Sequence, residues 1–255
     1  MLLAIDIGNS NIVFGISSSE KWEKIWRIHS EVTKTADEYE VIFRSLFQNA
    51  DFEINNKVNK VVISTVVPFL KMTFVKMIEK IFHITPIIIS PNIYGKIDIN
   101  VMNPYEIGTD IVANAYAAFK KFSGNNIVLD LGTALTLTTI NSKGEIRGVS
   151  IAPGIKTALY SLASDTAQLP MVEIEIPPSI LGKNTVHAIQ SGVIIGYKGM
   201  IEYMVGAIKK ELSTEVNVIA TGGLSKKLAP ILSCITKVEP NLTLDGLKYI
   251  ADEID

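Results

Sequence analysis

Cysteine, histidine and long apolar or basic runs are scarce in this sequence, and each scarcity excludes a class of protein. The chain of 255 residues contains one cysteine, Cys234, and three histidines. An intramolecular disulfide is therefore impossible, and no set of Cys and His has the spacing of a zinc site. No window reaches the ~20 consecutive apolar residues of a membrane helix. The 24 basic and 26 acidic residues nearly balance and form no dense basic block, which argues against a nucleic-acid-binding surface.

Several familiar sequence motifs are missing as well. No G-x-G-x-x-G follows an apolar run, so a Rossmann dinucleotide site is unsupported. The Gly-Lys pair at Gly182 would need a glycine at Pro177 to form a P-loop. The G-x-S-x-G motif of the α/β-hydrolase nucleophile elbow is absent, so nothing indicates a hydrolase of that class. The amino terminus has no basic start before its apolar run reaches Asp6, so we expect no secretory signal and a cytosolic protein.

What the sequence does contain predicts a large α/β fold. Hydrophobic residues make up 47% of the chain and charged residues 20%, which is enough for a sizeable core in one large domain or two moderate ones. Apolar periodicity predicts strands and helices in mixed order. The first half is predicted to contain strands at Leu2–Ile7, Ile12–Ile16, Trp22–His29, Lys60–Val67 and Pro86–Ser90, helices at Thr35–Phe47, Phe69–Phe82 and Ile107–Phe122, and a loop from Pro91 to Pro104.

The second half repeats the opening pattern of the first. The stretch AIDIGNSNIVFGI aligns with VLDLGTALTLTTI, so that Asp6 falls on Asp130 and Gly8 on Gly132, both at an offset of 124 residues (130 − 6 and 132 − 8). Such self-similarity indicates duplication. We therefore predict two related halves, residues 1–121 and 122–255. The second half is predicted to continue with helices at Ile155–Ser164 and Thr185–Leu212, strands at Val216–Ala220 and Thr236–Val238, and a terminal helix from Asp245.

The two Asp-x-Gly turns suit the binding of phosphate and metal. Glycine allows a ligand to approach the backbone closely, and successive N–H groups of a tight turn form an anion-binding concavity. A carboxylate at a strand end can hold Mg²⁺ through its water shell. One such turn alone is most often an ordinary exposed turn. Two at matching positions, together with the Thr221-Gly222-Gly223 turn after a later strand, favour a nucleotide site.

A set of short motifs in fixed order carries a resemblance to a known family. DIGNSNIVFG, GTDIVANAYAA, DLGTALTLT, IAPGI, TAQLP, SGVIIGYKGMIEYMV, ATGGLS and LTLDGLKYI cover nearly the whole chain. In this order they resemble the type III pantothenate kinases, of the superfamily of actin, heat-shock chaperone ATPases and sugar kinases. The resemblance implies duplicated ribonuclease-H-like halves around a central nucleotide cleft. It also implies ATP-dependent phosphorylation of pantothenate to 4′-phosphopantothenate, the first step of coenzyme A biosynthesis, by a homodimer that uses Mg²⁺ and a monovalent cation such as K⁺ or NH₄⁺.

The resemblance also implies a role for individual residues. Asp110 would be the catalytic base, Asp130 the ligand of the monovalent cation, and Asp6 a water-mediated contact of Mg²⁺. Thr185 would contact pantothenate across the dimer interface. From the residues alone, Asp110 has the position of a helix-capping acid, and that alternative stays open. The other implied contacts are those of ATP (Asp6, Ile7, Gly8, Asn9, Ser10, Asn11, Ile12, Val13 and Thr133) and those of the substrate loop (Gly108, Thr109, Asp110 and Ile111).

The match to the family fails at two positions on the acceptor side. The substrate loop usually reads Gly-x-Asp-Arg, and here the fourth residue is Ile111; a usual tyrosine is replaced by Val101. Arginine binds a carboxylate through paired hydrogen bonds, which isoleucine cannot form. Another group could replace it; the candidates are Tyr105, Lys183 and Lys156. The alternatives are a nucleotide-binding regulator with weak or no catalysis, or a kinase for another small hydroxy acid.

Overall fold

The computed structural model describes residues 1–18, 21–50 and 58–254, which form two compact units. Unit 1 comprises residues Met1–Lys120 and Leu242–Asp255, and unit 2 comprises Lys121–Asn241. The division at 121/122 expected from the sequence assigned the terminal helix to the second half, whereas in the structure this helix belongs to unit 1.

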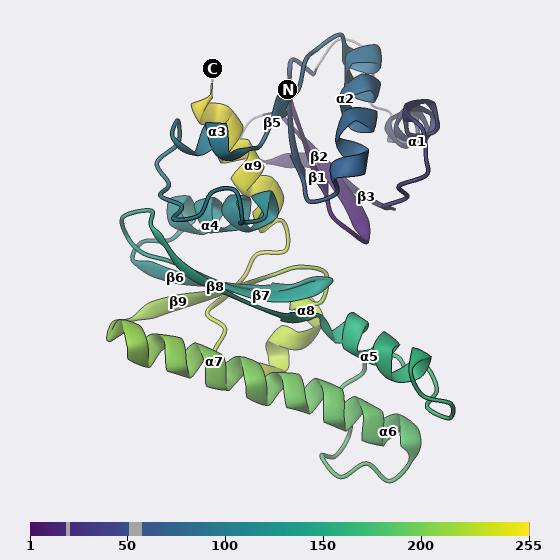
Figure 1. Ribbon diagram of the computed structural model, residues 1–255, viewed down its shortest axis with the longest axis vertical. Helices are drawn as coiled ribbons and strands as arrows, with labels where there is room; N and C mark the ends of the chain where they lie inside the picture. The colour runs from purple at the N-terminus through teal and green to yellow at the C-terminus, as the bar shows by residue number, and fades with distance from the viewer. Residues whose placement is uncertain (19–20, 51–57, 255) are drawn as a thin grey trace. The chain divides into compact units, whose positions relative to one another are not determined.

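Unit 1 is built on a five-stranded mixed sheet (Figure 1). Its strand order is β3-β2-β1-β4-β5, with β1, β2 and β3 antiparallel and β4 and β5 parallel to β1. The strands are β1 (Leu2–Ile7), β2 (Asn11–Ser17), β3 (Trp22–His29), β4 (Lys60–Thr65) and β5 (Ile87–Ile88), and the helices are α1 (Ala36–Gln48), α2 (Pro68–Phe82), α3 (Pro91–Tyr94), α4 (Thr109–Lys121) and α9 (Leu242–Glu253).

Unit 2 contains a second five-stranded sheet with the same topology. Its order is β8-β7-β6-β9-β10, and each strand has the same pairing direction as its counterpart in unit 1. This match confirms the predicted duplicated α/β fold. The strands are β6 (Asn125–Leu131), β7 (Ala134–Ile140), β8 (Ile146–Pro153), β9 (Val216–Thr221) and β10 (Lys237–Val238), and the helical segments are α5 (Ile155–Ser164), α6 (Thr185–Gln190), η1 (Ser191–Ile195), α7 (Gly196–Leu212), α8 (Ser225–Leu228) and η2 (Ala229–Ile231).

The core of unit 1 lies between its sheet and the α1–α2 pair. Strand residues that alternate inward meet the aromatic face of α1, where the Phe14 and Phe43 rings stack with their centroids 4.1 Å apart. Burial of such side chains, each contributing about 1.5–3 kcal/mol, dominates the stability of this layer. Helix α9 packs on β1 and β4 and also meets α4, where a Cβ on Gly246 would lie 1.9 Å from the Ala113 carbonyl oxygen. Only glycine permits this approach, which fixes α9 to unit 1.

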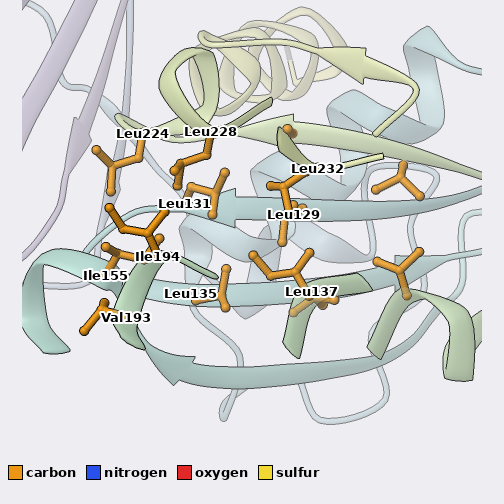
Figure 2. Close-up of a cluster of buried hydrophobic side chains, with 14 of the residues drawn as sticks. Leu129, Leu131, Leu135, Leu137, Ile155, Val193, Ile194, Leu224, Leu228 and Leu232 are labelled. Atoms are coloured by element: carbon orange, nitrogen blue, oxygen red, sulfur yellow. The ribbon is translucent and has the colours of Figure 1, made fainter. Parts of the chain in front are cut away.

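The core of unit 2 is a single apolar cluster between its sheet and the helices that follow (Figure 2). Leu129 of β6 is paired with Leu137 of β7, and Leu131 with Leu135, so all four leucines point to one face of the sheet. Residues of α5, η1 and α8 and of the segments on either side of α8 and η2 complete the cluster; Figure 2 labels Ile155, Val193, Ile194, Leu224, Leu228 and Leu232 among them. This layer supports β6, the strand that carries Asp130.

Several elements differ from the expected ones; the strand expected at Pro86–Ser90, for example, is only the two residues of β5. The segment 91–94, expected as loop, forms the short helix α3, consistent with Pro91 at its first position. The expected helix 185–212 contains the π-helical turn η1 at residues 191–195, a feature frequent at functional sites. Strand β4 ends at Thr65, whose hydroxyl accepts a hydrogen bond from the Val67 N–H and turns the chain. Helix α9 begins three residues earlier than expected, at Leu242. Within the described residues, no helix has both the length and the apolar character to span a membrane.

Candidate active site

The first hairpin of unit 1 places small polar residues at the carboxyl end of β1. Strands β1 and β2 pair up to Ile7 and Ile12, and the Gly8 N–H donates to the Asn11 carbonyl over 3.0 Å, which closes the turn. Asn9 and Ser10 are exposed at the tip. Ser30 fixes the turn through two hydrogen bonds. Its hydroxyl donates to the Gly8 carbonyl, and its N–H donates to the Ser10 carbonyl. The tip is therefore fixed in shape while its outer side stays accessible.

The eight residues from Asp6 to Val13, predicted to contact ATP, differ in what they can offer a ligand. The side chains of Ile7 and Ile12 are fully buried in the core of unit 1, so only their backbone groups can face a ligand. Asp6 is partly buried at the end of β1. The backbone N–H groups of such a turn suit phosphate oxygens, and the carboxylate that precedes the turn suits a largely hydrated Mg²⁺.

Two hydroxyl groups connect the hairpin strand to the predicted substrate loop within unit 1. Ser64 lies beside Asp6 in the parallel β1–β4 pairing, and its buried hydroxyl is 2.9 Å from the Thr109 hydroxyl. Thr109 also donates to the Thr65 carbonyl over 3.3 Å. The start of α4 is thereby held at the carboxyl end of β4, next to the strand that bears Asp6. Ser64 was not among the predicted site residues; the signal that could have found it is a polar residue at the end of an otherwise apolar strand.

Asp110 occupies the second position of α4 in a partly buried site. Burial raises the pKa of its carboxyl above the ordinary value, because removal from water disfavours the anion. The Ile111 N–H donates to its Oδ1 over 2.8 Å, which opposes that rise by favouring the anion. Gly108 leaves room for the carboxylate, since a Cβ there would lie 2.4 Å from Oδ1. Asp110 is thus a partly desolvated carboxylate in a defined orientation, as a proton acceptor requires.

In unit 2, Asp130 has the place in β6 that Asp6 has in β1. It is paired with Thr136 of β7 and with Thr221 of β9. Two glycines surround its carboxylate: a Cβ on Gly132 would lie 3.2 Å from Oδ1, and a Cβ on Gly222 only 2.3 Å. Gly222 also has a φ of +87°, which L-residues rarely adopt. The turn at Gly222 therefore needs glycine, whereas at Gly132 a side chain would only press tightly on the Asp130 carboxylate.

Thr133 is exposed at the tip of the second hairpin, and its backbone is held by the loop before α5. Its carbonyl accepts hydrogen bonds from the Gly154 N–H over 3.0 Å and from the Thr157 hydroxyl over 2.8 Å. A Cβ on Gly154 would lie 2.4 Å from that carbonyl oxygen, so the motif IAPGI packs directly on the turn. The side chain of Thr133 is left on the accessible side.

Thr185 lies elsewhere in unit 2, at the first position of α6. Asn184 caps this helix by accepting the His187 N–H over 2.8 Å. Thr185 and Lys183 line an open hollow of about 770 Å³ between the end of α5 and the α6–η1 helix. The π-helical turn contributes Gly192 and Val193 to its wall. The hollow offers an amide, a hydroxyl and an ammonium group on an otherwise apolar lining.

The residues at the two atypical positions of the acceptor side lie in unit 1. Val101 and Ile111 are both partly buried, and neither offers a polar side-chain atom. Tyr105, on the same loop as Gly108, is 83% exposed.

Among the described residues, no cluster of three or more His, Cys, Asp or Glu could hold a metal ion. A metal at Asp6 would therefore take most of its ligands from water and substrate oxygens, as Mg²⁺ usually does in proteins.

Comparison with solved structures shows the same fold in distant proteins. A protein of the Baf family of transcriptional activators from Campylobacter jejuni superposes with a TM-score of 0.62 at 20% identity, over 98% of each chain. The activator of the 2-hydroxyisocaproyl-CoA dehydratase from Clostridium difficile, solved with ADPNP, superposes with a TM-score of 0.56 at 13% identity, over 99% of this chain and 94% of the other. These superpositions over nearly the whole chain confirm the predicted duplicated α/β fold.

Comparison of sequences is more specific. The family model of type III pantothenate kinase matches residues 2–207. The type III pantothenate kinase of Citrifermentans bemidjiense is 41% identical over 250 residues, which is 98% of each chain. That of Moorella thermoacetica is 40% identical over 252 residues, again 98% of each chain. The match extends over both units and includes both Asp-x-Gly hairpins and the Gly108–Asp110 loop. The chain belongs to the type III pantothenate kinase family.

Proposed function

We propose that this chain transfers the γ-phosphoryl group of ATP to the 4′-hydroxyl of pantothenate, the first step of coenzyme A biosynthesis, with Asp110 as the general base. The observation that carries the proposal is the placement of Asp110. A partly desolvated carboxylate stands at the start of α4, and Ser64 and Thr109 hold that start beside the strand of the phosphate-type hairpin. A primary alcohol is a poor nucleophile, so a carboxylate within hydrogen-bond reach orients it and accepts its proton as transfer proceeds.

The first hairpin has the groups expected of the phosphate site. The kinase uses ATP with a divalent metal, and Mg²⁺ supplies neutralisation of the charge on the phosphate oxygens. Asp6 would hold the ion through its water ligands, and the backbone of residues 7–13 would line the phosphates. Phosphoryl transfer passes through a loose transition state, so positioning and charge neutralisation supply most of the catalysis. The braced tip supports this role, because a fixed turn need not reorganise when the ligand binds.

The second hairpin has the groups expected of the monovalent-cation site. We assign Asp130 as the ligand of K⁺ or NH₄⁺ and Thr133 as a nucleotide contact. The glycines around the Asp130 carboxylate support the assignment, since they keep side chains away from its Oδ1. The single cysteine, Cys234, is a free thiol, and a reducing compartment keeps thiols in that state. We therefore place the protein in the cytosol.

We further propose that the chain forms a homodimer through unit 2, with Thr185 contacting the pantothenate of the partner subunit. Several large apolar side chains are exposed on α5, α6, α7 and the loop before α6. They are Tyr160, Met171, Ile176, Ile180, Leu181, Val186 and Tyr203, with exposed fractions from 42% to 78%. Exposed apolar surface of this kind, where it is contiguous, is typical of protein–protein interfaces. On the acceptor side, Tyr105, Lys183 and Lys156 remain the candidates to replace the missing arginine.

A coupled ADP-release assay tests the proposed reaction. With ATP, Mg²⁺ and K⁺ we expect ADP to form only when pantothenate is added, and 4′-phosphopantothenate to appear in equal amount. Nucleotide binding without turnover would indicate a regulator that lost catalysis, for which the Ile111 substitution is the best argument. Turnover of another hydroxy acid in place of pantothenate would show that Ile111 and Val101 changed the acceptor.

The assigned cation site gives a second prediction. We expect the rate to fall when K⁺ is replaced by Na⁺ at constant ionic strength. The substitution Asp130→Asn should remove this difference, because the neutral amide attracts the cation less strongly. Rates in K⁺, NH₄⁺ and Na⁺ are compared for parent and variant. A parent rate that is equal in K⁺ and Na⁺ would contradict the role given to Asp130.

A further inference from the structure

Ser64 places a fully buried hydroxyl near the end of β4, on the same face of the sheet as Asp6. The two residues are partners in the parallel β1–β4 pairing, so their side chains leave the sheet on the same side. The alternate strand residues Ile5, Ile7 and Ile63 belong to the apolar core beneath α1 and α2. Asp6 and Ser64 therefore face away from that core. A hydroxyl buried in an apolar strand needs a hydrogen-bond partner to offset its lost hydration.

The partner of Ser64 is Thr109, the first residue of α4. The two hydroxyl oxygens are 2.9 Å apart, and the Thr109 hydroxyl also donates to the Thr65 carbonyl over 3.3 Å. A hydroxyl has a single proton to donate, and that of Thr109 is used at Thr65. Ser64 therefore supplies the proton of the shorter bond. The Thr109 hydroxyl is held by one donor and one acceptor, both on β4.

These bonds fix the first turn of α4 and not Thr109 alone. The Val112 N–H donates to the Gly108 carbonyl over 3.2 Å, so Thr109 and Asp110 are the first two positions of the helix. The turn after β4 adds an apolar contact, since a Cβ on Gly108 would lie 3.6 Å from Cγ1 of Val66. A displacement of Thr109 would therefore carry Asp110 with it.

We propose that Ser64 is a positioning residue for the reaction: through the Thr109 hydroxyl it holds the first turn of α4, and with it the Asp110 carboxylate, beside the strand that bears Asp6. This inference rests on the proposed role of Asp110. A general base must lie within hydrogen-bond distance of the alcohol, and a displacement of about 1 Å can cost about 10²-fold in rate. The Thr65 and Val66 contacts remain when Ser64 is changed, so the loss should be smaller than that.

The substitution Ser64→Ala removes the donor. We expect kcat to fall about tenfold while KM for ATP stays within about twofold, because the first hairpin keeps its own hydrogen bonds. Thr109→Val keeps the shape of the side chain and loses both bonds, so its kcat should fall at least as far. Thr109→Ser keeps the hydroxyl and should retain most of the parental kcat. Ser64→Ala combined with Thr109→Val should be no slower than Thr109→Val alone, because the shared contact is already absent.

Ser17→Ala is the matched control in steady-state kinetics and thermal unfolding. Ser17 is 2% exposed, its hydroxyl donates to the Lys21 carbonyl over 3.0 Å, and its pairing with Leu2 places it at the opposite end of the same sheet. We expect its melting temperature to fall about as much as that of Ser64→Ala, with the parental kcat.

Three results would overturn the role of Ser64 while Asp110→Asn remains inactive and the base stands. They are a parental kcat for Ser64→Ala, an equal loss of kcat for Ser17→Ala, and full additivity in the double variant. If Asp110→Asn is fully active, the proposed base fails, and the inference about Ser64 fails with it.

Discussion

Replacing Asp110 with asparagine is expected to lower kcat by about 10²–10⁴-fold, the usual contribution of a general base. The asparagine side chain keeps the size of the carboxylate, and its oxygen can still accept the Ile111 N–H. Nucleotide affinity should therefore remain within about twofold of the parent. Steady-state kinetics with pantothenate and calorimetric titration with an ATP analogue separate the two effects. Asp98→Asn, which changes an exposed acid of the same unit, is the matched control and should leave both unchanged.

The same variant should be more stable than the parent at neutral pH. Burial raises the folded-state pKa of Asp110 above its unfolded value, so the folded state binds the proton more tightly. The stability linked to this proton is present below the unfolded pKa and is lost as pH rises through the folded pKa. Asparagine avoids that loss because it stays neutral. The melting temperature of the variant minus that of the parent should be positive at pH 8 and shrink as pH falls below the folded pKa. A difference that grows toward acid pH would contradict the burial of this carboxyl.

Replacing Gly222 with alanine is expected to destabilise the protein by about 2–5 kcal/mol, from two additive causes. Its φ of +87° costs an L-residue about 1–2 kcal/mol. The new Cβ would also lie 2.3 Å from the Asp130 Oδ1 and 2.7 Å from the Leu131 carbonyl carbon, and overpacking of this kind costs about 1–3 kcal/mol. Because the carboxylate must move, activation by K⁺ should also need a higher cation concentration.

Gly124→Ala shows the first cause alone, so the difference between the two variants measures the second. Gly124 has nearly the same φ, +85°, but a Cβ there would have no neighbour within 4 Å. It should therefore show only the conformational cost, with a smaller fall in melting temperature and unchanged cation activation. Scanning calorimetry of both variants and the parent measures the difference. Equal falls for the two glycines would show that Gly222 does not press on Asp130.

The duplicated fold could be predicted from the sequence because its signals are local. Strand alternation, the Asp-x-Gly turns and the 124-residue offset between Asp6 and Asp130 each lie within a short window. Both hairpins therefore formed as expected, with the two acids at equivalent strand ends. The motifs also placed Asp110 near the start of a helix, where the structure has it. The membership of the family followed from the order of these short motifs.

Contacts between distant segments were decided only by the tertiary structure, because no local period encodes them. Helix α9 joined unit 1 since Gly246 fits against the backbone of α4, more than a hundred residues earlier. The Ser64–Thr109 contact and the approach of Gly222 to Asp130 likewise join residues far apart in the chain. Helix α3 was expected as loop, yet it forms a short helix that buries Tyr94. The sequence alone determined which chemical groups the site contains. Which of these groups come into contact was decided by tertiary packing, because those contacts form only when whole faces of the sheets and helices are buried against one another.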